Sequence, residues 1–209
     1  GRGFFILDDY SALREFTEEN LNKKGKLFKP RKAKWFVPRS NIGNTGSDYY
    51  FADNPTYGAV FTYHLSDDYK TKREIRRDKE IELNKRKSNI PFPGWENLDK
   101  ERGEDPAHVV LTIQDTSGKV INKISKKARK GSSRISWDFT HFNPYAVSSE
   151  SPRYNYSGAL VKPGIYKASL SLVQNGEVTT LDGPISFEIK AIREGILNGI
   201  GFEEYNRYL

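Results

Sequence analysis

The 209-residue sequence contains no cysteine and no methionine. The first absence excludes disulfides, thiolate catalysis and cysteine-based zinc sites, because each of them needs a cysteine sulfur. It leaves the compartment open, since a chain without cysteine folds equally well in an oxidising or a reducing space. No run of 18 apolar residues occurs either, so the sequence predicts no membrane-spanning segment.

Signatures of common enzyme sites are also missing. There is no nucleophile elbow, no phosphate-binding loop and no dinucleotide fingerprint. The three histidines, His64, His108 and His141, are scattered and have no metal-ligand spacing. The sequence therefore predicts no cofactor and no metal site.

Carboxylates are plentiful, and two groups of them could be taken for a catalytic pair or a calcium site. Neither interpretation holds. Asp8 and Asp9 follow an apolar run, yet adjacent residues of a strand point to opposite faces, so this pair cannot easily converge as a glycosidase pair does. The segment 115–118 begins like a calcium loop but lacks the alternating acidic ligands, and a hairpin turn explains it. We predict no catalytic residue in this chain.

The length and composition fit one sizeable core. Hydrophobic residues make up 36%, charged residues 29% and aromatic residues 13%, a balance typical of a folded chain rather than a disordered one. Tyrosine and phenylalanine, twelve of each, suit half-buried sheet surfaces. We expect a globular protein rich in strands.

The clearest strand pattern runs from Leu160 to Leu181. From Tyr166 to Leu172, apolar residues take every second position, which indicates a strand with one buried face. Asn175 and Gly176 suit a type I′ turn, so residues 177–181 are expected to fold back as an antiparallel partner. Further strands are predicted at 35–37, 58–65, 108–114, 119–125, 134–139 and 185–189, with a basic loop over 126–133. Together they favour an all-β, immunoglobulin-like antiparallel β-sandwich, with Trp137 in its core.

A polar segment interrupts the strands. Residues 67–87 contain no proline or glycine and mix nine basic with six acidic residues, so we expect one solvated helix capped by Ser66 or Asp67. Residues 89–105 follow as a turn with exposed aromatic side chains. The insertion is thus predicted to cover 67–105.

The net charge of +7 is concentrated in two stripes. Residues 23–39 carry eight basic residues and residues 119–134 carry seven, with no acidic residue in either. Such stripes attract phosphates or acidic sugars, and they are also typical of solvated loops and protected strand edges. Because no nucleic-acid motif accompanies them, we do not expect nucleic acid as a partner.

Aromatic residues in long loops are the better candidates for a binding site. Flat rings there stack on sugar faces in many binding modules, although the same rings can also pin loops onto a sandwich. The candidate ligand-binding residues are Trp95, Tyr145, Tyr154 and Tyr156.

Several stretches together suggest a known family. The opening GRGFFILDDYSALR resembles the closing strand of β-propellers in large secreted bacterial proteins with BNR or sortilin-like repeats, often labelled glycosyl hydrolases. NPTYGAVFTYHL, VVLTIQDTSGKVI, GSSRISWDF and ALVKPGIYKASL resemble, in the same order, the FlgD-like immunoglobulin sandwich that follows the propeller, and IPFPGWENLDKERGEDP has a counterpart in its helical excursion. There is no S-x-D-x-G-x-T-W Asp-box, so no catalytic residue of that family can be transferred to this chain.

The resemblance implies a division of the chain. Residues 1–25 are expected to be the remnant of a propeller blade with its linker, 26–190 the sandwich, and 191–209 a tail. The chain begins without an initiator methionine and is expected to be a piece of a longer secreted, cell-surface or periplasmic protein.

The function expected from the resemblance is that of a non-catalytic C-terminal accessory module whose partner is the parent protein's own propeller. The alternatives are a carbohydrate-binding module that uses the loop aromatics on glycans, and a part of a glycoside hydrolase that contributes to its active site.

Overall fold

The fold is centred on a long β-hairpin. The computed structural model describes residues 9–37, 55–142, 158–192 and 204, and in it β7 (Gly164–Gln174) pairs with β8 (Glu177–Ala191) along almost their whole length. Asn175 and Gly176 have positive φ angles of 53° and 80°, as the predicted turn requires. The hairpin is confirmed, but the separate strand predicted at 185–189 is wrong, because β8 runs on through it.

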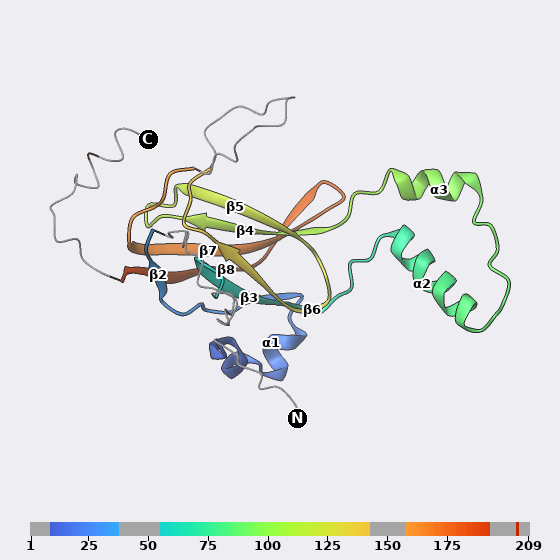
Figure 1. Ribbon diagram of the computed structural model, residues 1–209, viewed down its shortest axis with the longest axis horizontal. Helices are drawn as coiled ribbons and strands as arrows, with labels where there is room; N and C mark the ends of the chain where they lie inside the picture. The colour runs from blue at the N-terminus through green and yellow to red at the C-terminus, as the bar shows by residue number, and fades with distance from the viewer. Residues whose placement is uncertain (1–8, 38–54, 143–157, 193–203, 205–209) are drawn as a thin grey trace, which may run out of the picture.

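Two sheets are built around this hairpin (Figure 1). The larger has the order β2-β8-β7-β4-β5, with β2 at Ala33–Trp35, β4 at His108–Gln114 and β5 at Val120–Lys127. The smaller has the order β1-β3-β6, with β1 at Gly25–Leu27, β3 at Ala59–Leu65 and β6 at Gly131–Trp137. The expectation of purely antiparallel pairing is wrong at one place, since β2 lies parallel to β8.

The core lies between the two sheets. Strand β3 alternates buried and half-buried residues along its length, and β4 does the same. Phe61 of the small sheet meets Phe187 of the large one edge to face, with ring centroids 5.0 Å apart. Trp137, predicted as a core residue, is buried among these rings, so the mostly β, two-sheet architecture is confirmed.

The basic loop predicted over 126–133 is much shorter in the structure. Strand β5 continues to Lys127 because Lys126 and Lys127 pair with β4. Strand β6 already begins at Gly131, opposite Leu65 of β3. The loop is thereby reduced to residues 128–130.

The insertion contains two helices instead of one. Helix α2 (Lys72–Lys85) begins after Thr71, whose side chain forms a capping box with Glu74, so Ser66 and Asp67 are not the cap. Helix α3 (Trp95–Arg102) occupies part of the segment predicted as a turn. Neither helix has a buried residue, and together they project from the sandwich as an arm (Figure 1). Among the described residues, no helix is long and apolar enough to cross a membrane.

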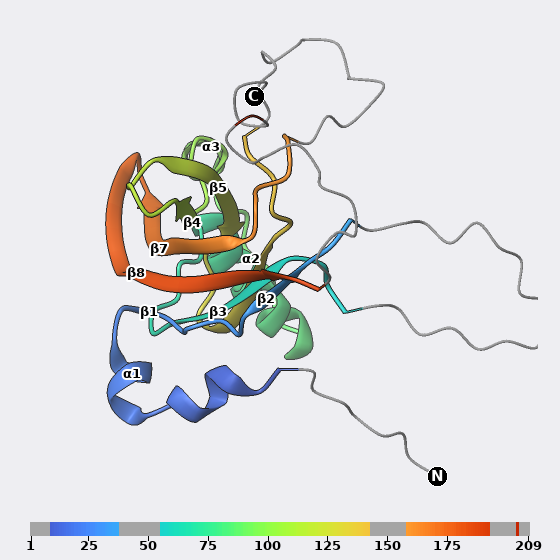
Figure 2. The same ribbon diagram turned by 90° about the vertical axis from the view of Figure 1, so that its left-hand side faces the viewer.

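The N-terminal segment lies on the outer side of the small sheet. It forms a 3₁₀ turn, η1 (Ser11–Glu15), and a short helix, α1 (Glu18–Asn22), on the side away from β7 and β8 (Figure 2). Tyr10 occupies the N-cap position of the turn, and just before it Oδ1 of Asp9 accepts hydrogen bonds from the backbone N–H and the hydroxyl of Ser11. The apolar run that precedes Asp8, which by its resemblance is expected to be a propeller strand, lies outside the described residues.

Candidate functional site

A groove opens where the chain leaves the small sheet. Phe28 still donates its N–H to the carbonyl of Thr62 in β3, at 3.0 Å, but the next position that would pair with β3 is Pro30, which has no N–H. The chain therefore diverges to join β8 as β2. Because backbone groups alternate along an antiparallel pair, the N–H and C=O of Val60 face this open edge.

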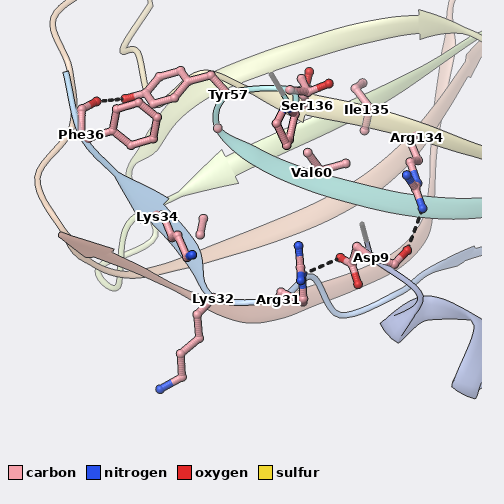
Figure 3. Close-up of a pocket in the computed structure, with 14 residues that line it drawn as sticks. Asp9, Arg31, Lys32, Lys34, Phe36, Tyr57, Val60, Arg134, Ile135 and Ser136 are labelled. Carbon is pink, nitrogen blue, oxygen red and sulfur yellow. Dashed lines mark hydrogen bonds and ion pairs between the residues drawn. The ribbon is translucent and has the colours of Figure 1, made fainter. Parts of the chain in front are cut away.

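The groove has a volume of about 990 Å³ and an apolar floor with a basic rim (Figure 3). Its floor includes Val60 and Ile135, and its rim includes Arg31, Lys34 and Arg134. These cations come from both basic stripes of the sequence, which the fold brings to one place. Among the described residues that line the groove, Asp9 is the only carboxylate.

Asp9 connects the two arginines of the rim. Its Oδ2 lies 3.2 Å from Nε of Arg31, and its backbone carbonyl accepts a hydrogen bond from Nη2 of Arg134 at 2.8 Å. Burial alone would raise the pKa of Asp9, but the hydrogen bonds from Ser11 and the two arginine charges outweigh it and lower the pKa. The carboxylate is thus ionised at neutral pH and holds the N-terminal segment in place.

Lys34 and Lys32 differ in their surroundings. Lys32 points away from the groove and pairs with Glu188 at 2.7 Å (Figure 3). Lys34 forms no ion pair with any described residue. The groove therefore keeps positive charge available, which suits an anionic group.

Two aromatic rings form one end of the groove. The hydroxyl of Tyr57 donates to the carbonyl of Phe36 at 2.5 Å, and the rings of these residues meet edge to face at 4.9 Å. Burial raises the pKa of Tyr57, so its hydroxyl stays protonated as a donor. Nothing in the sequence marked this groove except the two basic stripes.

His64 and Asp115 take part in local contacts, and His141 is partly buried. His64 lies within hydrogen-bonding distance of Ser132 on the neighbouring strand, at 3.0 Å. Burial, helped by the charge of Lys119, lowers the pKa of His141 and keeps it neutral. Asp115 accepts from Ser117 and Lys119 within the β4–β5 turn, as the hairpin prediction required. Among the described residues, no group of acids and histidines has a metal-binding arrangement.

Of the four aromatic candidates, only Trp95 falls within the described residues. Tyr145, Tyr154 and Tyr156 lie outside them, so their contribution to a binding site stays a prediction. Trp95 begins α3 on the arm and is 74% exposed. Its ring packs edge to face against Phe92 at 5.1 Å, and neither residue lines the basic groove.

Comparison with protein families and with curated proteins identifies no relative of this chain. No protein-family model matches the chain, and no curated protein shows a significant match to it.

Proposed function

We propose that this chain is a non-catalytic accessory β-sandwich, of the kind that follows a BNR-repeat or sortilin-like propeller in secreted bacterial proteins. It acts by packing against the domain that precedes it. The finer topology proposed for it is immunoglobulin-like.

The observation that supports this proposal is the way residues 9–22 lie on the small sheet. The ring of Phe16 packs 4.8 Å from that of Phe28. Phe28 is fully buried yet does not belong to the main core. The N-terminal segment therefore forms a partial third layer, and Asp9 fixes its beginning to Arg31 and Arg134. A domain that precedes Asp9 would enter the sandwich at one defined place.

The reading frame upstream of Gly1 gives the first test. The proposal expects Asp-box repeats there and, in the longer protein, a sandwich that unfolds at a higher temperature than the isolated chain does. Such a shift is the sign of a stabilising interface. Calorimetry of both proteins measures it.

The matched variants are Arg134→Ala, which removes the bond to Asp9, and Arg129→Ala, which removes an exposed arginine of the neighbouring loop. Arg134→Ala is expected to reduce the shift and Arg129→Ala to leave it unchanged. An upstream sequence without such repeats, or equal unfolding temperatures in the two proteins, would refute the proposal.

A further inference from the structure

The end of the helical arm carries an unusual combination of side chains. The loop between α2 and α3 lies farthest from the sandwich along the arm (Figure 1). Residues 85–95, here called the arm tip, read KRKSNIPFPGW and contain no acidic residue. Basic side chains fill one end of the tip and apolar side chains the other.

The apolar end is exposed to solvent. Ile90 is 43% exposed, Phe92 63% and Trp95 74%. Single exposed apolar residues are common on protein surfaces, but three large ones within six residues mark a place that contacts something else.

Local contacts also fix the conformation of the arm tip. The side-chain amide of Asn97 donates to the carbonyl of Pro93 at 2.7 Å, and two prolines flank Phe92. The Phe92 ring packs against Trp95, so both rings project from an ordered turn. Little conformational entropy is lost when such a preorganised loop binds.

The basic end of the tip is unpaired. Lys85, Arg86 and Lys87 are exposed, and none forms an ion pair with a described residue. Elsewhere on the arm, by contrast, Arg76 and Lys100 pair with glutamates. Free cations beside free apolar side chains fit a partner that is anionic at its surface and apolar beneath it.

We propose that the arm tip binds the surface of a membrane that contains anionic lipids. Lys85, Arg86 and Lys87 contact phosphate headgroups, while Phe92 and Trp95 enter the interfacial layer, where tryptophan is favoured. A sugar site fits less well, because the neighbours of Trp95 in the tip are mainly apolar and offer few hydrogen bonds to orient hydroxyl groups. This inference does not depend on the proposed packing against a propeller.

The test uses the whole chain and two kinds of vesicle. One is phosphatidylcholine alone, and the other is an equal mixture of phosphatidylcholine and phosphatidylglycerol. The chain is expected to sediment with the anionic vesicles, to be released by high salt, and to bind neutral vesicles about 100-fold more weakly, since each cation near an anionic surface contributes about 1 kcal/mol. Tryptophan emission of the chain should shift to shorter wavelength on binding, because the exposed ring of Trp95 leaves water, and the shift should be absent from the variant without Trp95.

Two pairs of variants locate the contact. Replacing Lys85, Arg86 and Lys87 by glutamine should weaken binding about 100-fold. The charge-matched control replaces Lys24, Lys29 and Lys130 by glutamine and should change it little. The double variant Phe92→Ala, Trp95→Ala should weaken binding at least tenfold. The control Val178→Ala, which removes another exposed apolar side chain, should not weaken it. All the replaced side chains are exposed or partly exposed, so the variants should fold.

Four outcomes overturn the proposal. The chain sediments with neither kind of vesicle, or the tip and control variants lose the same affinity, or the chain sediments while its tryptophan emission stays unchanged. Release from the vesicles by soluble neutral oligosaccharides would also overturn it and would favour a glycan at Trp95.

Discussion

The carboxylate of Asp182 in β8 accepts a hydrogen bond from the backbone N–H of Leu27 in β1, at 2.8 Å. The same carboxylate pairs with Lys26 at 2.9 Å. Since β1 and β8 belong to different sheets, one side chain ties the two layers together at their edge. The neighbouring Gly25 permits this approach, because a Cβ there would lie 2.6 Å from the side chain of Leu181.

Asp182→Ala should therefore lower the free energy of unfolding by about 1–3 kcal/mol, because it leaves the N–H of Leu27 without an acceptor. Asp182→Asn keeps an acceptor oxygen but not the charge. It should therefore lower the free energy of unfolding by less than Asp182→Ala does. Urea unfolding of the three proteins measures both values. A loss below about 0.5 kcal/mol in the alanine variant, as at an ordinary surface site, would contradict the role of Asp182.

The same residue predicts how stability depends on pH. Burial raises the pKa of Asp182, but the hydrogen bond from Leu27 and the contact with Lys26 lower it more, so the pKa in the folded protein lies below the ordinary 3.8. A group with a lowered pKa stabilises the fold fully above its unfolded pKa and loses this contribution as the pH falls through the folded pKa. The advantage of the wild type over Asp182→Asn should therefore shrink below about pH 3.8. Urea unfolding curves at several pH values test this, and a constant difference would disagree with it.

Gly58 and Gly118 make a matched pair for backbone strain. Both have positive φ angles, 112° and 93°, but a Cβ at Gly58 would lie 2.0 Å from the backbone oxygen of Trp137, whereas one at Gly118 meets nothing within 4 Å. Gly118→Ala should lower the free energy of unfolding by about 1–2 kcal/mol, because a residue with a Cβ is strained in the left-handed conformation. Gly58→Ala adds a clash with the backbone at the start of β3, so it should lower the free energy of unfolding by about 3 kcal/mol or more. Thermal unfolding ranks the two, and equal losses would show that β3 shifts to accept the methyl group.

The strands could be predicted from the sequence because their signals are local. Alternation along Ala59–Leu65 and His108–Gln114 reports one buried face, and Asn175 with Gly176 selects a hairpin turn. Pairing partners were harder to predict. The parallel contact of β2 with β8 depends on where the chain goes after Pro30, which no local pattern encodes.

The groove and the arm tip were predicted only in part. Two basic stripes were visible in the sequence, but only the fold brings Arg31 and Arg134 to the same carboxylate. In the insertion, Pro93 and Gly94 indicated a turn. For this reason the sequence analysis did not predict the helix α3 that begins at Trp95. Gly94, with a φ of 87°, serves as the residue before the helix.

Arg76 and Glu101 form a bidentate ion pair on the arm. Nε and Nη2 of Arg76 donate to the two carboxylate oxygens of Glu101 at 2.8 and 2.9 Å, and this pair links α2 to α3. Since neither helix has a buried residue, we expect the pair to hold the arm together rather than to stabilise the sandwich. Arg76→Gln should leave the melting temperature of the sandwich nearly unchanged and should raise amide exchange over 72–102 several-fold.

The control for this variant is Lys79→Gln, which removes a charge from the same helix without breaking an ion pair of the described residues. The hydrogen bonds from Arg76 lower the pKa of Glu101 below its ordinary 4.5, against an opposing effect of burial. The link between the helices should therefore weaken as the pH falls below 4.5, and amide exchange in the wild-type arm should then approach that of Arg76→Gln. Exchange that is equally fast in both variants at neutral pH would show that the arm is held together by its backbone and loop alone.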